Sequence, residues 1–234
     1  MMAYGHAMTV SMYVWLCRIS LLSGMVCAAG LAVHVARHPQ KMAIMNAVWP
    51  LCALFGGFVM VWMYWRYGRS GPGKAPEWVT VAKGTLHCGS GCTLGDLAAE
   101  WIVFAIPPVA VGFGWHWLFA EKLFATWIFD SMLAFAFGIL FQYFAIAPMP
   151  GISGKAGIKA AIKADAASLA AWQIGMFAVM ALFQFVLYPR FLGQRPDAAS
   201  STFWFAMQWA MIGGFVTSFP VNRLLIAKGL KEAM

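Results

Sequence analysis

The sequence predicts an all-α fold, a polytopic bundle of about six transmembrane helices, and three observations lead to this prediction. The chain of 234 residues is 62% hydrophobic and only 10% charged, whereas soluble domains carry about 25% charged residues. Its mean hydropathy is +0.73, and it contains twelve Trp residues, a type enriched at membrane interfaces. Six apolar stretches are each long enough to cross a bilayer, for which about 20 residues are needed.

These stretches should be helices of one domain, 1–234. In lipid every backbone polar group must be paired within its own segment, which favours helices, and the alternation typical of membrane barrels is absent. Because the intervening loops are short, we expect successive helices to pack as antiparallel neighbours. The predicted spans are residues 13–35, 42–65, 92–119, 125–148, 166–189 and 202–226.

The Lys and Arg residues divide unevenly between the two sets of loops. Eleven fall with the N-terminus, the 66–91 and 149–165 connections and the C-terminus, and five fall with the other loops. Loops rich in Lys and Arg stay in the cytoplasm, so we expect both termini on the cytoplasmic side. The net charge of +8 arises in these loops, and no basic run or zinc finger indicates nucleic acid as a partner.

One segment, residues 87–92 with the sequence His-Cys-Gly-Ser-Gly-Cys, concentrates residue types that bind metals. If Gly89 and Gly91 permit a tight turn, then His87, Cys88 and Cys92 can converge on one ion. Thiolate and imidazole ligands suit Zn or Cu(I). A cytoplasmic location keeps both thiols reduced, which favours a metal site over a permanent disulfide.

Asp96 and Glu100 follow Cys92 at intervals of four residues, so the three side chains share one face of a helix that enters the membrane. Ionisable residues in lipid usually face a bundle interior or a wet cavity. In the alternative interpretation, Thr93 and Asp96 form a capping box at a helix start, and the cysteines are incidental. Capping does not account for Glu100. The candidate metal ligands are His87, Cys88, Cys92, Asp96 and Glu100.

Other polar residues of the spans can meet this helix face. A cluster in the cytoplasmic third is expected, although helix–helix hydrogen bonding is the alternative for its amides. Its members are Gln142, Tyr143, Asp165, Ser168, Gln173 and Asn222. Asp130 lies near the opposite face, where it can form an outer polar site with His116, His34 or His38. The alternative is that these histidines are ordinary residues of the membrane interface.

Several segments resemble a family of bacterial membrane proteins known only as domain of unknown function 4396. The resemblance rests on Arg37–Met42, Ile44–Pro50, Leu86–Asp96, Phe141–Met149, Ala171–Met176, Phe219–Asn222 and Lys228–Met234. The family's name implies no activity. The resemblance implies the bacterial inner membrane, and some similar proteins are joined to metal-binding modules, which implies a link with heavy-metal handling.

The leading hypothesis is a protein that binds or transports a soft transition metal, Cu(I) or Zn, through a His/Cys/Cys site above a carboxylate pair. No motif of a hydrolase, nucleotide-binding protein or haem protein is present, so we expect no enzyme and assign no catalytic residue. The alternatives are a structural or assembly subunit of a larger membrane complex and a thiol-redox membrane enzyme. The expected partners are the lipid bilayer, the metal ion and other membrane subunits.

Overall fold

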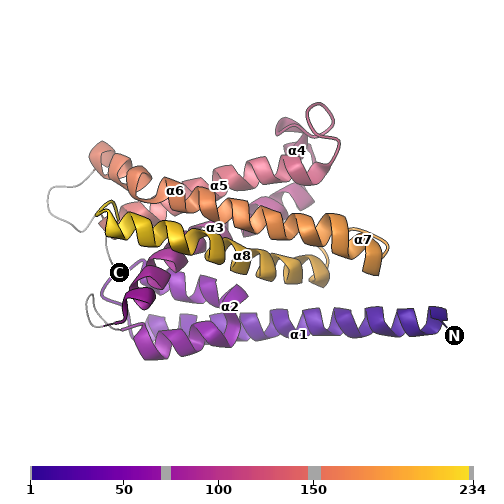
Figure 1. The fold of residues 1–234 in the computed structure, drawn as a ribbon, viewed down its shortest axis with the longest axis horizontal. Coiled ribbons are helices and arrows are strands. Elements are labelled where there is room, and N and C mark those ends of the chain that lie inside the picture. Colours follow the sequence, from indigo (N-terminus) through magenta and orange to yellow (C-terminus); the bar gives the residue numbers. More distant parts are fainter. Residues whose placement is uncertain (1, 70–74, 147–153, 232–234) are drawn as a thin grey trace.

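The computed structural model describes residues 2–69, 75–146 and 154–231, and the elements assigned in these ranges are helices (Figure 1). The predicted all-α helical bundle is therefore confirmed. The helices are α1 (Met2–Arg37), α2 (Met45–Tyr67), α3 (Glu77–Ala105), α4 (Pro108–Gly112), α5 (Lys122–Ile146), α6 (Gly154–Ala181), the π-helix η1 (Leu182–Leu187), α7 (Tyr188–Phe191) and α8 (Ser201–Ala227).

Five stretches of the described chain are helical, long and apolar enough to cross a membrane, as expected of an integral membrane protein. They are Met8–Arg37, Met45–Tyr67, Lys122–Ala145, Gly154–Phe191 and Ser201–Ala227. Large apolar side chains on their outer faces, including Trp62, Ile174 and Leu224, are more than half exposed. Such surfaces are stable when they face lipid.

The helix α2 folds back on itself at Gly57, where φ is +49° and ψ is −130°. In a straight helix Trp49 and Tyr64 would be about 22 Å apart along the axis, but their ring centroids are 5.4 Å apart. Tyr64 also lies 5.5 Å from the ring of His34, near the end of α1. Both arms of α2 thus pack beside the second half of α1 (Figure 1). The predicted span 42–65 is therefore a helical hairpin, which the chain enters and leaves at the same end of the bundle.

The tip of this hairpin is held inside the protein. The carbonyl oxygen of Leu54, near the break in the helix, accepts a hydrogen bond of 2.7 Å from Nε2 of Gln208 on α8. Gly24 of α1 packs directly against the same carbonyl, and the ring of Phe55 contacts that of Trp172 on α6 at 6.0 Å. Irregular backbone at membrane depth needs such partners, because lipid offers none.

The helix α3 runs through the middle of the bundle, and its bounds differ from the predicted span 92–119. It begins at Glu77 and ends at Ala105, because the next residue, Ile106, has a φ of −130° and a ψ of 73°, outside the helical range. Pro107 explains this end, since the residue before a proline disfavours the helical conformation. The helices α2, α5, α6 and α8 pack around α3 and bury its polar residues. Because of these polar residues, α3 is less hydrophobic than the five stretches that are apolar enough to cross a membrane.

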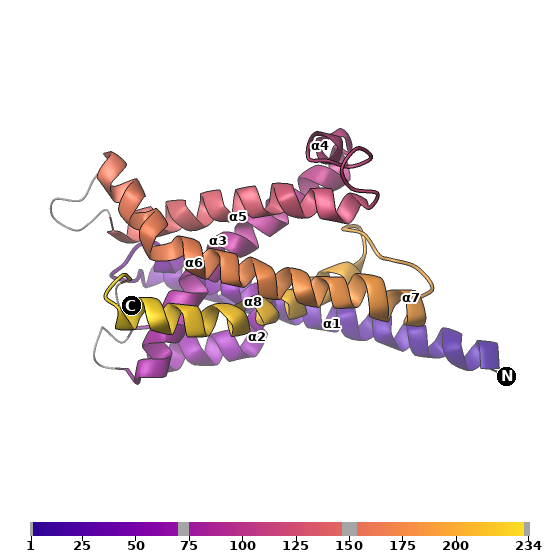
Figure 2. The same ribbon diagram turned by 45° about the horizontal axis from the view of Figure 1, so that its top comes forward.

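The two ends of the chain lie at opposite ends of the bundle (Figures 1 and 2). This differs from the expectation that both termini share one side, and the cause is the hairpin at Gly57, which removes one crossing. We call the two ends of the bundle the N-terminal end, where α1 begins, and the C-terminal end, where α8 finishes.

The hairpin also changes the division of positive charge. Eleven of the described Lys and Arg residues lie at the C-terminal end, namely Arg37, Lys41, Arg66, Arg69, Lys83, Lys155, Lys159, Lys163, Arg223, Lys228 and Lys231. Four lie toward the N-terminal end, namely Arg18, Lys122, Arg190 and Arg195. The charge asymmetry predicted from the sequence therefore remains, but different residues produce it. Arg37 and Lys41 lie at the end with more positive charge, contrary to the prediction, and Arg18 lies toward the other end.

Replacing Gly57 tests the hairpin. A Cβ atom at this position has no atom within 4 Å, so Gly57→Ala introduces backbone strain without a clash. We expect it to lower the free energy of unfolding in detergent by about 1–3 kcal/mol. The control is Gly30→Ala, which also meets open space but in helical backbone, and which should leave stability unchanged or raise it by up to about 1 kcal/mol. Equal melting temperatures for both variants would contradict a turn at Gly57.

Candidate functional site

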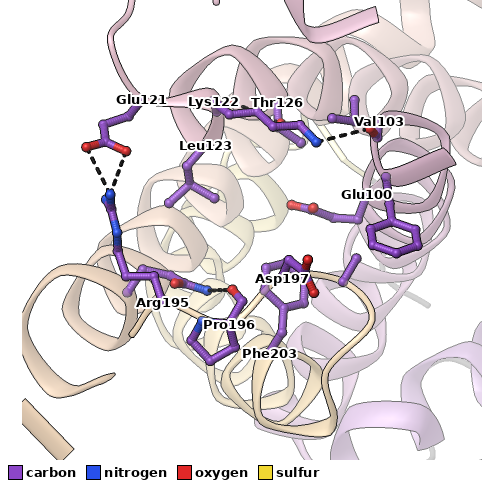
Figure 3. Close-up of a pocket in the computed structure, with 13 residues that line it drawn as sticks. Glu100, Val103, Glu121, Lys122, Leu123, Thr126, Arg195, Pro196, Asp197 and Phe203 are labelled. Atoms are coloured by element: carbon purple, nitrogen blue, oxygen red, sulfur yellow. Dashed lines mark hydrogen bonds and ion pairs between the residues drawn. The ribbon is translucent and has the colours of Figure 1, made fainter. Parts of the chain in front are cut away.

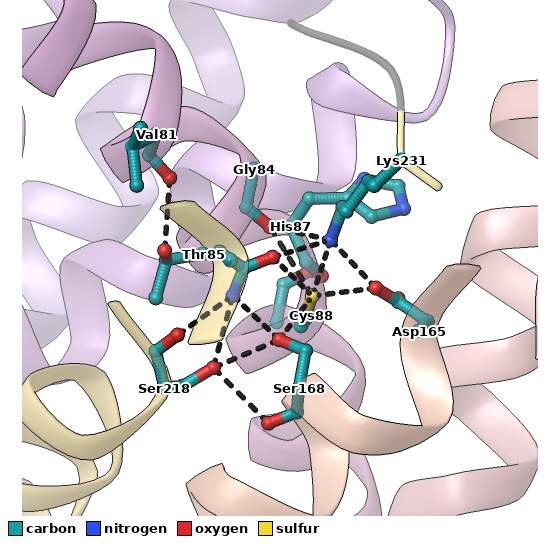
Figure 4. A network of polar contacts seen from close by, with 11 residues as sticks. Val81, Gly84, Thr85, His87, Cys88, Asp165, Ser168, Ser218 and Lys231 are labelled. Carbon is teal, nitrogen blue, oxygen red and sulfur yellow. Dashed lines mark hydrogen bonds and ion pairs between the residues drawn. The ribbon is translucent and has the colours of Figure 1, made fainter. Parts of the chain in front are cut away.

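A buried polar cluster joins α3, α6, α8 and the segment after α8 at the C-terminal end (Figure 4). We call it the Lys231 cluster. Its members are Gly84, Cys88, Asp165, Ser168, Ser218, Asn222 and Lys231. The ammonium group of Lys231 donates to four acceptors: Oδ1 of Asp165 at 2.6 Å, Sγ of Cys88 at 2.7 Å, Oδ1 of Asn222 at 2.8 Å and the carbonyl oxygen of Gly84 at 3.1 Å.

The remaining members hold these acceptors in place. Nδ2 of Asn222 donates to Oγ of Ser168 at 2.5 Å and to Oγ of Ser218 at 3.0 Å, which turns its amide oxygen toward Lys231. The two serine hydroxyl groups are 2.8 Å apart. Ser168 lies 3.2 Å from the Cys88 sulfur, and that sulfur lies 2.9 Å from Oδ1 of Asp165. These contacts make the cluster one connected network across three helices.

The charges of the cluster are removed from solvent. The side chains of Lys231 and Asp165 are both 0% exposed. Burial lowers the pKa of the Lys231 ammonium, but Asp165 and Cys88 raise it by more, to about 12. Lys231 is therefore a cation at neutral pH. A buried ion pair of this kind needs further hydrogen bonds to offset its desolvation, and the four acceptors supply them.

His87 lies beside this cluster but does not join its hydrogen bonds. The ring is fully buried and stands 6.4 Å from the ring of Phe141 on α5. Neither ring nitrogen has a hydrogen-bond partner among the described residues. Asp165 and Lys231 are the charged groups that interact with the His87 ring electrostatically. His87 is thus an unused polar side chain at the edge of the Lys231 cluster.

A second group of ionisable residues, which we call the carboxyl cluster, consists of Asp96, Glu100 and Asp130. Asp96 on α3 and Asp130 on α5 are fully buried, and their carboxyl groups are close enough to act electrostatically on each other. Two carboxylates so placed repel each other unless one of them carries a proton. Among the described residues no donor serves the oxygens of either aspartate, or Oε1 of Glu100 one turn further along α3.

A cavity at the N-terminal end is lined by one member of the carboxyl cluster, Glu100 (Figure 3). Its volume is about 160 Å³, and the Glu100 side chain extends into it from α3. Lys122 on α5 also lines the cavity and donates to the carbonyl oxygen of Val103 at 3.2 Å. Arg195, another lining residue, forms an ion pair of 2.9 Å with Glu121. The cavity therefore brings charged side chains of this end of the bundle close to Glu100.

An apolar layer separates the two clusters. Cys92 lies between Cys88 and Asp96 on α3, fully buried among apolar side chains that include Leu169 and Trp172. Cys88 and Asp96 are eight residues apart, which corresponds to about 12 Å along the helix. The polar interior is therefore divided into two compartments.

The glycines of the 87–92 segment pack helices and do not make the expected turn. A Cβ at Gly89 would collide with the Trp172 ring, and one at Gly91 would lie 2.6 Å from Cα of Gly138 on α5. The segment is continuous helix, so His87, Cys88 and Cys92 point to different neighbours. The alternative capping box is also wrong, because Thr93 and Asp96 lie in the middle of α3, and the Thr93 hydroxyl donates to the carbonyl oxygen of Gly89.

The five predicted ligands thus divide among three regions. Cys88 belongs to the Lys231 cluster with His87 beside it, Asp96 and Glu100 belong to the carboxyl cluster, and Cys92 lies in the apolar layer. Within residues 2–69, 75–146 and 154–231, no three His, Cys, Asp or Glu side chains are grouped so that they could hold a metal ion. All five cysteines are free and buried.

The expected polar cluster is found in part. Asp165, Ser168 and Asn222 converge as predicted, although Asp165 lies three turns inside α6 and not at its start. Gln142 and Gln173 stay outside this network, and neither amide atom of Gln173 has a partner among the described residues.

Two members of the site were not foreseen. Asp130 faces Asp96 and not the histidines of the interface. Lys231 appeared to be an ordinary loop charge, and in sequence nothing separates it from Lys228, which is exposed. Two of the segments that resemble the family are described only in part. Glu232–Met234 of the segment Lys228–Met234 and Ala147–Met149 of the segment Phe141–Met149 lie outside the described residues.

The close approach of α3 and α5 can be tested at Gly95. A Cβ there would lie 2.5 Å from the backbone nitrogen of Ala134 and 2.6 Å from its Cα, so Gly95→Ala must push the helices apart. We expect a loss of about 1–3 kcal/mol in the free energy of unfolding. Gly84→Ala on the same helix is the control, since its nearest atom would be 3.7 Å away. If thermal melts of the two variants coincide, α3 and α5 are not packed as described.

The sequence model of one family, described as domain of unknown function (DUF4396), matches residues 77–231. The matched region begins with the first residue of α3 and ends with Lys231, so it contains both clusters. No curated protein and no solved structure matches the chain.

Proposed function

The chain belongs to the DUF4396 family, whose description assigns no activity, and from its two clusters we propose that it is a membrane transporter that moves a cation along α3. The observation that carries this proposal is the carboxyl cluster. Asp96, Asp130 and Glu100 lie inside a bundle of apolar helices, and within the described residues no basic side chain pairs with them. Carboxyl groups in such surroundings must take up a proton or a cation, and in membrane proteins they mark ion and proton pathways.

The two compartments support transport over static binding. The cavity at the N-terminal end is lined by Glu100 of the carboxyl cluster, while the Lys231 cluster lies near the C-terminal end. The apolar layer at Cys92 keeps them apart. A transporter needs such a barrier, because a continuous polar path would leak the ions whose gradient it uses.

The proposed cargo is a soft transition metal ion, Cu(I) or Zn, with the carboxyl cluster carrying coupled protons. Cys88 is the reason, since a thiol beside the carboxylate of Asp165 is a donor pair suited to such ions. The thiol-redox alternative receives less support, because Cys88 and Cys92 face different neighbours.

Flux through proteoliposomes tests the proposal. With Zn²⁺ outside and a pH-sensitive dye inside, we expect zinc entry accompanied by proton exit. Asp96→Asn and Glu100→Gln should reduce both signals to those of empty vesicles, because the amides cannot exchange a proton. The control is Glu77→Gln, whose carboxylate is 72% exposed in a surface ion pair with Arg223, and which should retain wild-type flux. Wild-type zinc flux in Asp96→Asn would refute a role for the carboxyl cluster, and the same assay with Cu(I) tests the second ion.

The orientation that we propose places the C-terminal end in the cytoplasm and the N-terminal end on the other side, because most Lys and Arg lie at the former. All native cysteines are buried, so a cysteine introduced at an exposed position reports its own side. An impermeant thiol reagent should label Gln194→Cys in intact cells, and should label Lys228→Cys only after permeabilisation. The reverse pattern would invert the orientation.

A further inference from the structure

The buried space around Lys231 has the composition of a cation site. Three helices supply one sulfur and three oxygen acceptors, from Cys88, Asp165, Asn222 and Gly84, all within 3.1 Å of the same nitrogen. An ammonium group has three N–H donors, fewer than the four acceptors that surround it. The acceptors thus surround a charge from several directions, as ligands surround an ion (Figure 4).

Unused ligand atoms lie beside this space. Oδ2 of Asp165 and both ring nitrogens of His87 are buried and have no hydrogen-bond partner in the described part of the chain. Buried polar atoms are rarely left without partners in native proteins. A cluster that only anchored Lys231 to the bundle would not explain why these polar atoms are buried without hydrogen-bond partners.

The occupant is attached through a short connection. After α8, Gly229 takes a φ of +65°, which ends the helix in the manner of a glycine cap. The backbone nitrogens of Leu230 and Lys231 then donate to the carbonyl oxygen of Leu225 at 2.9 and 3.3 Å. Among the described residues, these two hydrogen bonds to α8 and the contacts of the side chain hold Lys231 in place. Its side chain can therefore leave through a change in the short segment after α8, without a shift of the helices.

We propose that this space is a binding site for a soft metal cation and that Lys231 is a built-in occupant which the arriving ion displaces. Cys88 and Asp165 are the primary ligands, and Oδ1 of Asn222 and the carbonyl oxygen of Gly84, which already face the ammonium group, complete the set after it leaves. The proposal deepens the proposed transport function, on which it rests for the class of ion. It places the entry site at the C-terminal end and makes its occupancy a competition between the ion and the chain's own lysine.

Binding of Cd²⁺, a soft ion whose thiolate complexes absorb in the ultraviolet, tests the competition in purified protein. Lys231→Met removes the competitor and should lower the Kd for Cd²⁺ by about tenfold or more. Lys228→Met is the matched control, because Lys228 is exposed three residues earlier, and it should bind as the wild type does. The charge-transfer absorption should vanish in Lys231→Met with Cys88→Ser. Unchanged affinity in Lys231→Met, or absorption that survives without Cys88, would overturn the proposal.

A measurement on the wild-type chain covers the case in which Lys231→Met does not fold. Acylation by an amine reagent, followed by mass spectrometry, reports which lysines are accessible. Cd²⁺ should raise the acylation rate of Lys231 several-fold and leave that of Lys228 unchanged. If Cd²⁺ does not expose Lys231, the ion does not displace it and the proposal fails.

These binding experiments are independent of flux. Displacement of Lys231 in a protein that transports nothing would retain the site and reject the transport function. Flux without exposure of Lys231 would retain transport and reject the site.

Discussion

A polar helix in a membrane must be enclosed by protein, and this constraint shapes the whole bundle. Lipid cannot solvate the histidine, serine, threonine and carboxyl side chains of α3, so α2, α5, α6 and α8 cover it. The glycine residues of α3 allow a neighbouring helix to approach it closely. At Gly91 and Gly95 the backbone of α5 lies where a side chain would otherwise be. The polar interior is therefore bounded by backbone contacts, which admit little water between the helices.

Enclosure also decides which polar groups meet. Cys88 and Asp96 lie two turns apart on one helix, yet they face different surroundings because different helices cover them. At the level of Cys88 the neighbours are α6 and α8, which bring Asp165 and Asn222. At the level of Asp96 the neighbour is α5, which brings Asp130. One helix thus supplies a compensated charge pair at one depth and uncompensated carboxyl groups at another.

Composition and hydropathy predicted the membrane class and the helical fold, because both depend on averages over many residues. They missed the hairpin in α2, since its apolar run is 23 residues long and hydropathy does not record that Gly57 reverses the chain. The burial of Glu100 and the meeting of Cys88 with Asp165 and Asn222 followed from spacing and depth. The role of Lys231 could not be foreseen, because its entry into the interior depends on the path of three residues after α8. The sequence predicted a turn at Gly89 and Gly91, but both glycines lie at close contacts within the helix bundle. Glycine is favoured in turns and at close contacts alike, so its presence in the sequence does not distinguish the two.

The tip of the hairpin ties together helices that are far apart in the sequence. Leu54 and Phe55 contact Gln208 of α8, Gly24 of α1 and Trp172 of α6. Two of these partners follow the hairpin in the chain by more than one hundred residues. The tip can therefore reach its final position only after α6 and α8 have been synthesised and inserted, so the order in which the helices enter the membrane limits when this part of the fold is completed.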